Sequence, residues 1–165
     1  MNKGLLILGA GGYGRVVRET AESMGVFDKI DFLDDNSDAA IGKLSDYELY
    51  REMYNCAFVA MGRPELREKW LNALRDAGFE LPCIVSPVAY VSPSAVLEEG
   101  CIVEAMAIVN TGAKVHRGSL VCAGSVINHD AVVMDICQID CGAVVSAGAV
   151  VPQGTKVLSC TVFSK

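Results

Sequence analysis

The second half of the chain repeats every six residues, and this period restricts the possible folds more than any other feature of the sequence. From Val91 to Val162 the sequence divides into twelve consecutive units. The first residue of each unit is aliphatic, and the fifth is always Ala, Ser, Cys or Thr. A period of six matches neither an α-helix nor the alternation of a simple strand. It predicts a short strand followed by a corner, repeated around a triangular prism.

Such a prism explains each column of the repeat. The aliphatic residue enters the core, and the small residue sits near a corner where a larger one would not fit. Seven units carry glycine at their fourth position, as a corner with a positive φ requires. Three units close one coil, so the twelve units predict four coils. At a strand spacing of about 4.8 Å these coils rise roughly 19 Å.

One outward face of the prism carries an apolar stripe. The residue before each inward aliphatic must point outward, and on this face it is Ile108, Val126, Val144 and Val162. A soluble monomer rarely leaves such a stripe in water. Because the prism has a three-fold cross-section, further copies of the chain are the economical cover, and we predict a homotrimer. The alternative explanation is that strand propensity alone favours valine on an exposed face.

A histidine interrupts this apolar repeat. His129 takes the third position of its unit, which points outward near a corner, and Asp130 takes the column that is usually glycine, where a side chain is strained. One coil later, Ala147 and Gly148 place backbone N–H groups roughly 5 Å from the imidazole. We predict that His129 is a general base, that Asp130 orients it, and that these N–H groups face a developing oxyanion.

The first 85 residues predict a different architecture, a half-Rossmann βαβ domain. An apolar strand runs into Gly9, Gly11 and Gly14, and a helical pattern follows. A glycine turn at a helix N-terminus can cradle an anion. A second strand ends in Asp34 and Asp35, where a carboxylate can accept hydrogen bonds from a ribose or a base. The alternative is that the glycines serve only a tight strand-to-helix turn.

A third strand leads into an amphipathic helix over residues 65–77, with Leu66, Trp70 and Leu74 on its apolar face. Arg67 near the start of this helix would pair either with phosphate or with a surface carboxylate. The domain is only half of a dinucleotide fold, so a mononucleotide carrier such as a UDP-linked sugar fits its size better than NAD.

Composition excludes several classes of function. The net charge of −6, without a basic run, disfavours a nucleic-acid surface. No signal peptide and no long apolar run are found, which predicts a cytoplasmic protein without a membrane span. The seven cysteines lack metal-type spacing. His116 is expected to be a surface residue, and two histidines do not suffice for the three-ligand zinc site of a carbonic anhydrase. We therefore expect no metal.

The segments LGAGGYG, FLDD, MGRPELR, SPVAYVSPSA and NHD, together with the hexapeptide run, resemble the bacterial sugar O- and N-acetyltransferases of sialic-acid and UDP-4-amino-sugar pathways. The resemblance covers nearly the whole chain. It implies a sugar-nucleotide-binding domain over residues 1–85 and a left-handed parallel β-helix over residues 86–165. It also implies that acetyl-CoA, the acyl donor, lies along the prism between the subunits of a trimer.

The resemblance assigns roles to individual residues. The substrate-binding residues that it implies are Gly9, Gly11, Gly12, Gly14, Asp34, Asp35, Gly62 and Arg67. It assigns catalysis to His129 and Asp130. The positions expected to face acetyl-CoA are Gln138, Ala147 and Gly148, with Gln138 standing where some relatives have a second histidine.

The function predicted from these features is acetyl transfer from acetyl-CoA to the amino group of a UDP-linked sugar. A hydroxyl of sialic acid is the nearest alternative acceptor. A catalytically silent, trimeric sugar-nucleotide-binding scaffold is the alternative from another class, and the end of the chain at Lys165 favours it, because relatives usually continue for further coils that receive the nucleotide end of CoA. An NAD-dependent oxidoreductase fits less well, since no second substrate domain follows the glycine turn.

Overall fold

A computed structural model describes residues 3–164 of the chain. Internal contacts divide it into two units, Met1–Pro82 and Cys83–Lys165. This boundary lies slightly before the one expected at residue 85, because strand β5 (Ile84–Val85) already pairs with strand β8 (Ile102–Val103) of the repeat. The repeat therefore begins one unit before Val91.

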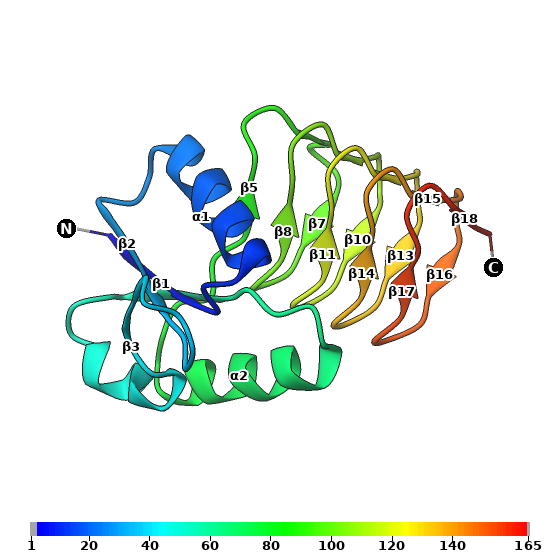
Figure 1. The fold of residues 1–165 in the computed structure, drawn as a ribbon. Helices are drawn as coiled ribbons and strands as arrows, with labels where there is room; N and C mark the ends of the chain where they lie inside the picture. The colour runs from blue at the N-terminus through cyan, green and yellow to red at the C-terminus, as the bar shows by residue number, and fades with distance from the viewer. Residues whose placement is uncertain (1–2, 165) are drawn as a thin grey trace. The chain divides into compact units, whose positions relative to one another are not determined.

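The first unit is built on a parallel sheet with the strand order β3-β2-β1-β4. Its strands are β1 (Gly4–Leu8), β2 (Lys29–Leu33), β3 (Ala40–Gly42) and β4 (Cys56–Val59). Every residue of β1 and β4 is buried, which explains why both have continuous apolar sequences rather than alternating ones. Helix α1 (Gly12–Met24) lies on one side of this sheet and helix α2 (Pro64–Asp76) on the other (Figure 1).

Glycine and proline residues account for the ends of the helices in this unit. Helix α1 starts directly after the glycine turn and stops at Gly25, which has a φ of 65°. Helix α2 starts with Pro64 at its first position, where the missing N–H is not needed. Neither helix in the described range 3–164 is long and apolar enough to cross a bilayer.

The predicted face of α2 is wrong in part. Its buried residues are Arg67, Leu71 and Leu74, whereas Leu66 and Trp70 are partly exposed. Trp70 packs edge-on against Tyr47, with their ring centroids 5.9 Å apart. Tyr47 belongs to a 3-10 helix, η1 (Leu44–Tyr50), which follows β3. The sequence pattern predicts neither β3 nor η1, because this polar and aromatic stretch has no strand or helix period.

The second unit is the predicted triangular prism of stacked coils (Figure 1). Each strand is two residues long and pairs with the strand one coil away, so that Val126 lies between Ile108 and Val144. Besides β5 and β8, its strands are β6 (Tyr90–Val91), β7 (Val96–Leu97), β9 (Ile108–Val109), β10 (Lys114–Val115), β11 (Leu120–Val121), β12 (Val126–Ile127), β13 (Val132–Val133), β14 (Gln138–Ile139), β15 (Val144–Val145), β16 (Val150–Val151), β17 (Lys156–Val157) and β18 (Val162–Phe163).

The prism core confirms the two columns read from the repeat. The inward aliphatic residues from Val103 to Val157 are buried, as are the small residues Ala107, Ala113 and Ala131. All seven corner glycines have φ between 65° and 70°. Four other residues share this column and its positive φ, namely Met106, Asp130, Ile136 and Cys160.

Candidate functional site

His129 stands at the corner that follows β12, and its side chain is 58% exposed. Its Nδ1 lies 2.9 Å from Oδ2 of Asp130. Its backbone N–H donates to Oδ1 of Asn128 at 2.8 Å. When Nδ1 carries the proton and donates it to the carboxylate, Nε2 keeps its lone pair, which is the form that a general base needs. The predicted contact between histidine and aspartate is therefore present.

Asp130 is held in an unfavourable backbone conformation, as the sequence predicts. Its φ is 59°, and for a residue with a side chain this conformation costs about 1–2 kcal/mol. A Cβ on Gly112, one coil below, would approach Oδ1 of Asp130 to 2.6 Å. Gly112 is thus needed twice, for its own positive φ and for the space that the carboxylate occupies. In the sequence, Gly112 looks like any other corner glycine of the repeat.

The two backbone N–H groups predicted to face an oxyanion are not equivalent. Gly148 donates its N–H to the carbonyl of His129 at 3.0 Å. This corrects the expectation that both groups are free. The N–H of Ala147 has no hydrogen-bond partner within residues 3–164. Ala147 is therefore the available donor, while Gly148 joins its coil to that of His129.

Gln138 lies on a different face of the prism. It belongs to β14 in the sheet β17-β14-β11-β8-β5, whereas His129 follows β12 of the sheet β18-β15-β12-β9-β6. Its Nε2 donates to Oδ1 of Asp140 at 2.8 Å. Within one chain, the fold does not bring Gln138 and His129 together. They can share a site only where two copies of the chain meet.

The second histidine lies beside two carboxylates at another corner. Nδ1 of His116 lies 3.0 Å from Oε1 of Glu98 and 3.9 Å from Oδ1 of Asp135. The ligand atoms of these three residues all lie within 4.8 Å of one another. The His116 side chain is 27% exposed, so it is a partly buried member of a charge cluster rather than a free surface residue.

In the first unit, the glycines of the turn divide into two kinds. Gly9 has a φ of 107°, and a Cβ there would meet the Ala60 carbonyl at 2.9 Å. A Cβ on Gly14 would lie 2.1 Å from the Gly9 carbonyl oxygen. Gly11 and Gly12 have no atom within 4 Å of such a Cβ, and their N–H groups find no partner in the part of the chain that the structure describes. Packing explains the first two glycines but not the last two.

We expect Gly14→Ala to lower the free energy of unfolding by about 1–3 kcal/mol, because its methyl group has no room beside the Gly9 backbone. Gly12→Ala is the matched control. It adds the same methyl group in open space at the start of α1 and should change the free energy of unfolding by less than about 0.5 kcal/mol. Urea titration followed by circular dichroism measures both. Equal stability of the two variants would contradict the packing argument.

The two adjacent aspartates, Asp34 and Asp35, make different contacts. Asp34 accepts the N–H of Ala10 on Oδ2 and that of Asn36 on Oδ1, both at 2.8 Å. It therefore ties the glycine turn to the end of β2. Asp35 is exposed, and its Oδ1 accepts the N–H of Leu44 at 3.1 Å. Of the two, Asp35 has the carboxylate oxygen that remains open to solvent.

Arg67 is buried rather than presented to solvent. It is 1% exposed, and its Nη1 donates to the carbonyls of Met61 at 2.7 Å and Gly62 at 3.0 Å. These two contacts are with backbone carbonyls, and the choice between phosphate and a surface carboxylate as a further partner stays a prediction. Arg67 fixes the segment after β4, in which Gly62 is exposed. The spacing of Arg67 with Leu71 and Leu74 is the helical signal that would have revealed its burial.

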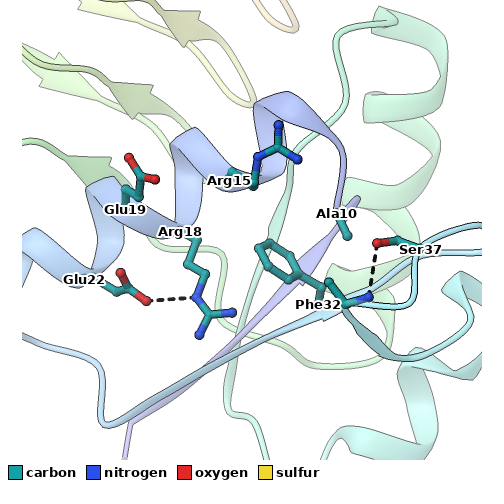
Figure 2. A pocket seen from close by; sticks show the side chains of 8 residues that line it. Ala10, Arg15, Arg18, Glu19, Glu22, Phe32 and Ser37 are labelled. Carbon is teal, nitrogen blue, oxygen red and sulfur yellow. Dashed lines mark hydrogen bonds and ion pairs between the residues drawn. The ribbon is translucent and has the colours of Figure 1, made fainter.

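A cavity of about 360 Å³ lies in the first unit beside α1 (Figure 2). Arg15, Arg18, Glu19 and Glu22 line it from α1, and Phe32 of β2 lines it from the sheet. Ala10 of the glycine turn also borders it. The sequence pattern does not distinguish these four charged residues, because a charged helix face is normally a solvated one.

The cysteines differ in burial and reactivity. Burial raises the pKa of the Cys56 thiol to about 11. Burial also raises the pKa of Cys122, and the Glu104 carboxylate acts in the same direction. Cys141 and Cys160 are exposed. We expect iodoacetamide at pH 8 to label Cys141 and Cys160 in the native protein, and Cys56 and Cys122 only after unfolding, as peptide mass spectrometry would show. Labelling of Cys122 in the native protein at the same rate would contradict this.

Known proteins share this combination of units. Residues 4–74 match the family model of the PglD N-terminal domain. The structure is similar to the acetyltransferase domain of PglB from Neisseria gonorrhoeae FA1090, with 31% identity, a TM-score of 0.85, and coverage of 98% of this chain and 88% of that one. The PglB domain has also been solved in complex with acetyl coenzyme A.

A second similar structure is a mutant of perosamine N-acetyltransferase from Caulobacter crescentus in complex with CoA and GDP-perosamine. It has 26% identity, a TM-score of 0.66, and coverage of 93% of this chain and 90% of that one. WeeI from Acinetobacter baumannii AYE, at 16% identity and a TM-score of 0.60, shares the fold. These matches confirm the fold class, a Rossmann-like α/β unit followed by a left-handed parallel β-helix.

Proposed function

Because the chain belongs to the bacterial sugar acetyltransferases and is thus an acetyl-CoA-dependent acyltransferase, we propose that it acetylates the amino group of a UDP-linked sugar. The observation that carries this proposal is the His129–Asp130 pair, with 2.9 Å between Nδ1 and Oδ2, at an exposed corner of the prism. A histidine buried in the core could not reach a substrate.

In the proposed mechanism, the sugar amine attacks the thioester carbonyl of acetyl-CoA and a C–N bond forms. Nε2 of His129 takes the proton that the amine loses, and Asp130 stabilises the imidazolium. The N–H of Ala147 donates to the oxyanion of the tetrahedral intermediate. The C–S bond then breaks, and the imidazolium returns its proton to the CoA sulfur. The products are an acetamido sugar and free CoA.

We place this reaction between subunits of a homotrimer. The outward stripe supports the trimer, since Ile108, Val126 and Val144 are only partly buried within one chain and Val162 is 67% exposed. The position of Gln138 on another face supports it as well. A neighbouring copy would bring its Gln138 toward His129 and acetyl-CoA, and would exclude water from the groove between them.

We assign the nucleotide to the first unit. The free N–H groups of Gly11 and Gly12 are the donors for its phosphate oxygens. Asp35 accepts from the ribose or the base, and the exposed backbone at Gly62 lies at the end of the neighbouring strand β4. Asp34 and Arg67, like Gly9 and Gly14, hold these segments in place. The size of the unit favours UDP, and the Caulobacter crescentus enzyme was solved with a GDP-linked sugar, so the experiment must include both nucleotides.

The test is to mix the full chain and acetyl-CoA with UDP- and GDP-linked amino sugars and with free sialic acid. Released CoA should be separated by chromatography, because the exposed thiols of Cys141 and Cys160 would react with a thiol reagent. We expect CoA release with an amino-sugar nucleotide and none with sialic acid. No release with any acceptor, from a protein that still binds nucleotides, would overturn acetyl transfer in favour of the silent scaffold.

We expect EDTA not to lower the rate of this reaction. The proposed steps use a histidine, a carboxylate and a backbone N–H, and the Glu98–His116–Asp135 cluster follows β7, β10 and β13 at another corner of the prism. The measurement is the rate of CoA release after dialysis against EDTA, with and without added Zn²⁺. A loss that Zn²⁺ restores would contradict the metal-free mechanism.

A further inference from the structure

Two cysteines lie one above the other in the first two coils of the prism. Cys83 directly precedes β5 and Cys101 directly precedes β8, and these strands pair in register through Ile84 and Ile102. The N–H of Ile84 donates to the carbonyl of Cys101 at 2.9 Å. Neighbouring strands lie about 4.8 Å apart, and disulfides join residues whose Cα atoms are about 4.4–6.8 Å apart. The fold therefore sets this pair at a separation that a disulfide can bridge.

The two side chains are also in direct contact. The thiol and the backbone N–H of Cys101 donate hydrogen bonds to the Cys83 sulfur and lower the pKa of Cys83, while burial opposes this lowering. The contact with Cys83, together with burial, raises the pKa of Cys101. Cys83 is partly exposed, whereas Cys101 is fully buried. One thiol of the pair is thus the more acidic and the more accessible, and the other is shielded from solvent.

The remainder of this column contains no second pair of neighbouring cysteines. Its residues from the first coil onward are Cys83, Cys101, Ser119, Cys137 and Thr155. Ser119 separates Cys101 from Cys137, and positions two coils apart are about 9.6 Å from each other, twice the strand spacing. This exceeds the limit of about 7 Å for a disulfide. Cys137 is therefore an internal comparison, because it shares the column and the complete burial of Cys101 but has no cysteine next to it in the column.

We propose that Cys83 and Cys101 form a reversible disulfide that fastens β5 to β8. Strand β5 is two residues long and lies at the edge of its sheet, at the end of the order β17-β14-β11-β8-β5. So short an edge strand is held by few backbone hydrogen bonds, and a covalent bond beside it would strengthen its attachment. The proposal concerns the integrity of the prism and does not depend on which acceptor the protein acetylates.

A peroxide is the oxidant that this reaction requires. The Cys83 thiolate attacks one oxygen of hydrogen peroxide, the O–O bond breaks, and hydroxide leaves as the sulfenic acid forms. The Cys101 sulfur then attacks the sulfenic sulfur, the S–S bond forms, and the hydroxyl group leaves with the thiol proton as water. The two thiols together lose two electrons and two protons, and the peroxide is reduced to two molecules of water. A thiol reductant reverses the product by thiol–disulfide exchange.

The test uses the full chain with Cys141→Ser and Cys160→Ser, which removes the two exposed thiols. The folded protein is treated with hydrogen peroxide, unfolded in mildly acidic urea with N-ethylmaleimide to block thiols, and cleaved after glutamate. Cys83 then lies in the peptide of residues 81–98, and Cys101 in that of residues 100–104. We expect mass spectrometry to find these two peptides joined in most of the protein, and dithiothreitol to separate them.

Two variants in this background serve as controls. Cys83→Ser should leave Cys101 as a thiol after the same treatment, because Cys101 is buried and Cys137 lies two coils away. Cys137→Ser should still give the joined peptides. The inference would be overturned if Cys83 were recovered as a thiol or a sulfinic acid without the joined peptides. Joining that occurs only when the protein is oxidised in urea would also overturn it, because the fold would then not be its cause.

Urea unfolding measures the effect of the bond on the prism. The oxidised protein should unfold at a midpoint roughly 1 M higher than the reduced protein, because the cross-link restricts the unfolded chain. Dithiothreitol should remove this gain. Cys83→Ser protein treated with the same peroxide corrects for oxidation of other residues, such as methionine. A joined protein whose corrected midpoint equals or falls below that of the reduced form would show that the bond does not fasten β5.

Discussion

His129→Ala should lower kcat for acetyl transfer by about two to four orders of magnitude, the range that a positioned general base contributes. Without the imidazole, the attacking amine must lose its proton to water. KM for the sugar nucleotide should change little, since the substitution removes a group that acts in the transition state rather than in binding. The side chain is 58% exposed, so the folded structure should tolerate its removal. Steady-state kinetics of CoA release measure this effect.

The matched control is the other histidine. His116→Ala removes an imidazole of the same size from a corner where it pairs with Glu98 rather than with substrate. Partly exposed ion pairs contribute about 0–1 kcal/mol, so this variant should keep kcat near the wild-type value with slightly lower stability. If His129→Ala retained kcat within a factor of about five, or if His116→Ala lost as much, the assignment of the base would be wrong.

The double substitution Val126→Glu and Val144→Glu should convert a trimer into monomers and abolish acetyl transfer. The two residues are register partners on β12 and β15 and lie in the middle of the outward stripe. Two carboxylates there would be buried without partners in an interface, which is strongly unfavourable. Light scattering reports the mass, and nucleotide binding by the first unit should persist, because it does not depend on the prism face.

Val150→Glu is the control for this pair. Val150 is also an outward valine and is 48% exposed, but its sheet, β16-β13-β10-β7, includes Lys114 in the outward column. A carboxylate at position 150 should therefore leave both the molecular mass of the assembly and the rate of acetyl transfer unchanged. The proposed site between subunits would be contradicted by a wild-type protein that is already monomeric. It would also be contradicted by a double variant that remains a trimer with full activity.

The repeat could be predicted in detail because local geometry determines the residue type at each position of a hexapeptide. A side chain there points inward, points outward, lies at a corner or has room only to be small. The first unit of the prism, residues 85–90, has the same columns, with the aliphatic Val85 first and the small Ala89 fifth, so the sequence pattern extends over it as well. The pairing of β5 with β8 establishes that the prism begins there. Strand β3 and η1 could not be predicted, because their residues show neither the period of a strand nor that of a helix.

The candidate site was predictable as a set of residues but not as a set of roles. Adjacent aspartates look alike in a sequence, yet Asp34 binds two backbone N–H groups and Asp35 faces solvent. Whether a glycine serves packing or leaves room for a ligand depends on what a Cβ would meet, which distinguishes Gly14 from Gly12. The hydrogen bond that occupies the Gly148 N–H is likewise a property of two stacked coils and not of either segment alone.

The missing side chain at Gly112 has a consequence for how this protein can change. Because the Asp130 carboxylate fills the volume that a methyl group at Gly112 would need, the two positions are not free to mutate independently. Replacing Gly112 disturbs a carboxylate eighteen residues away in the sequence, although Gly112 itself touches no reactant. A substitution at Asp130 by a smaller residue, in turn, relaxes the steric demand on the coil beneath. The order in which two mutations arise would then decide whether an intermediate protein still works.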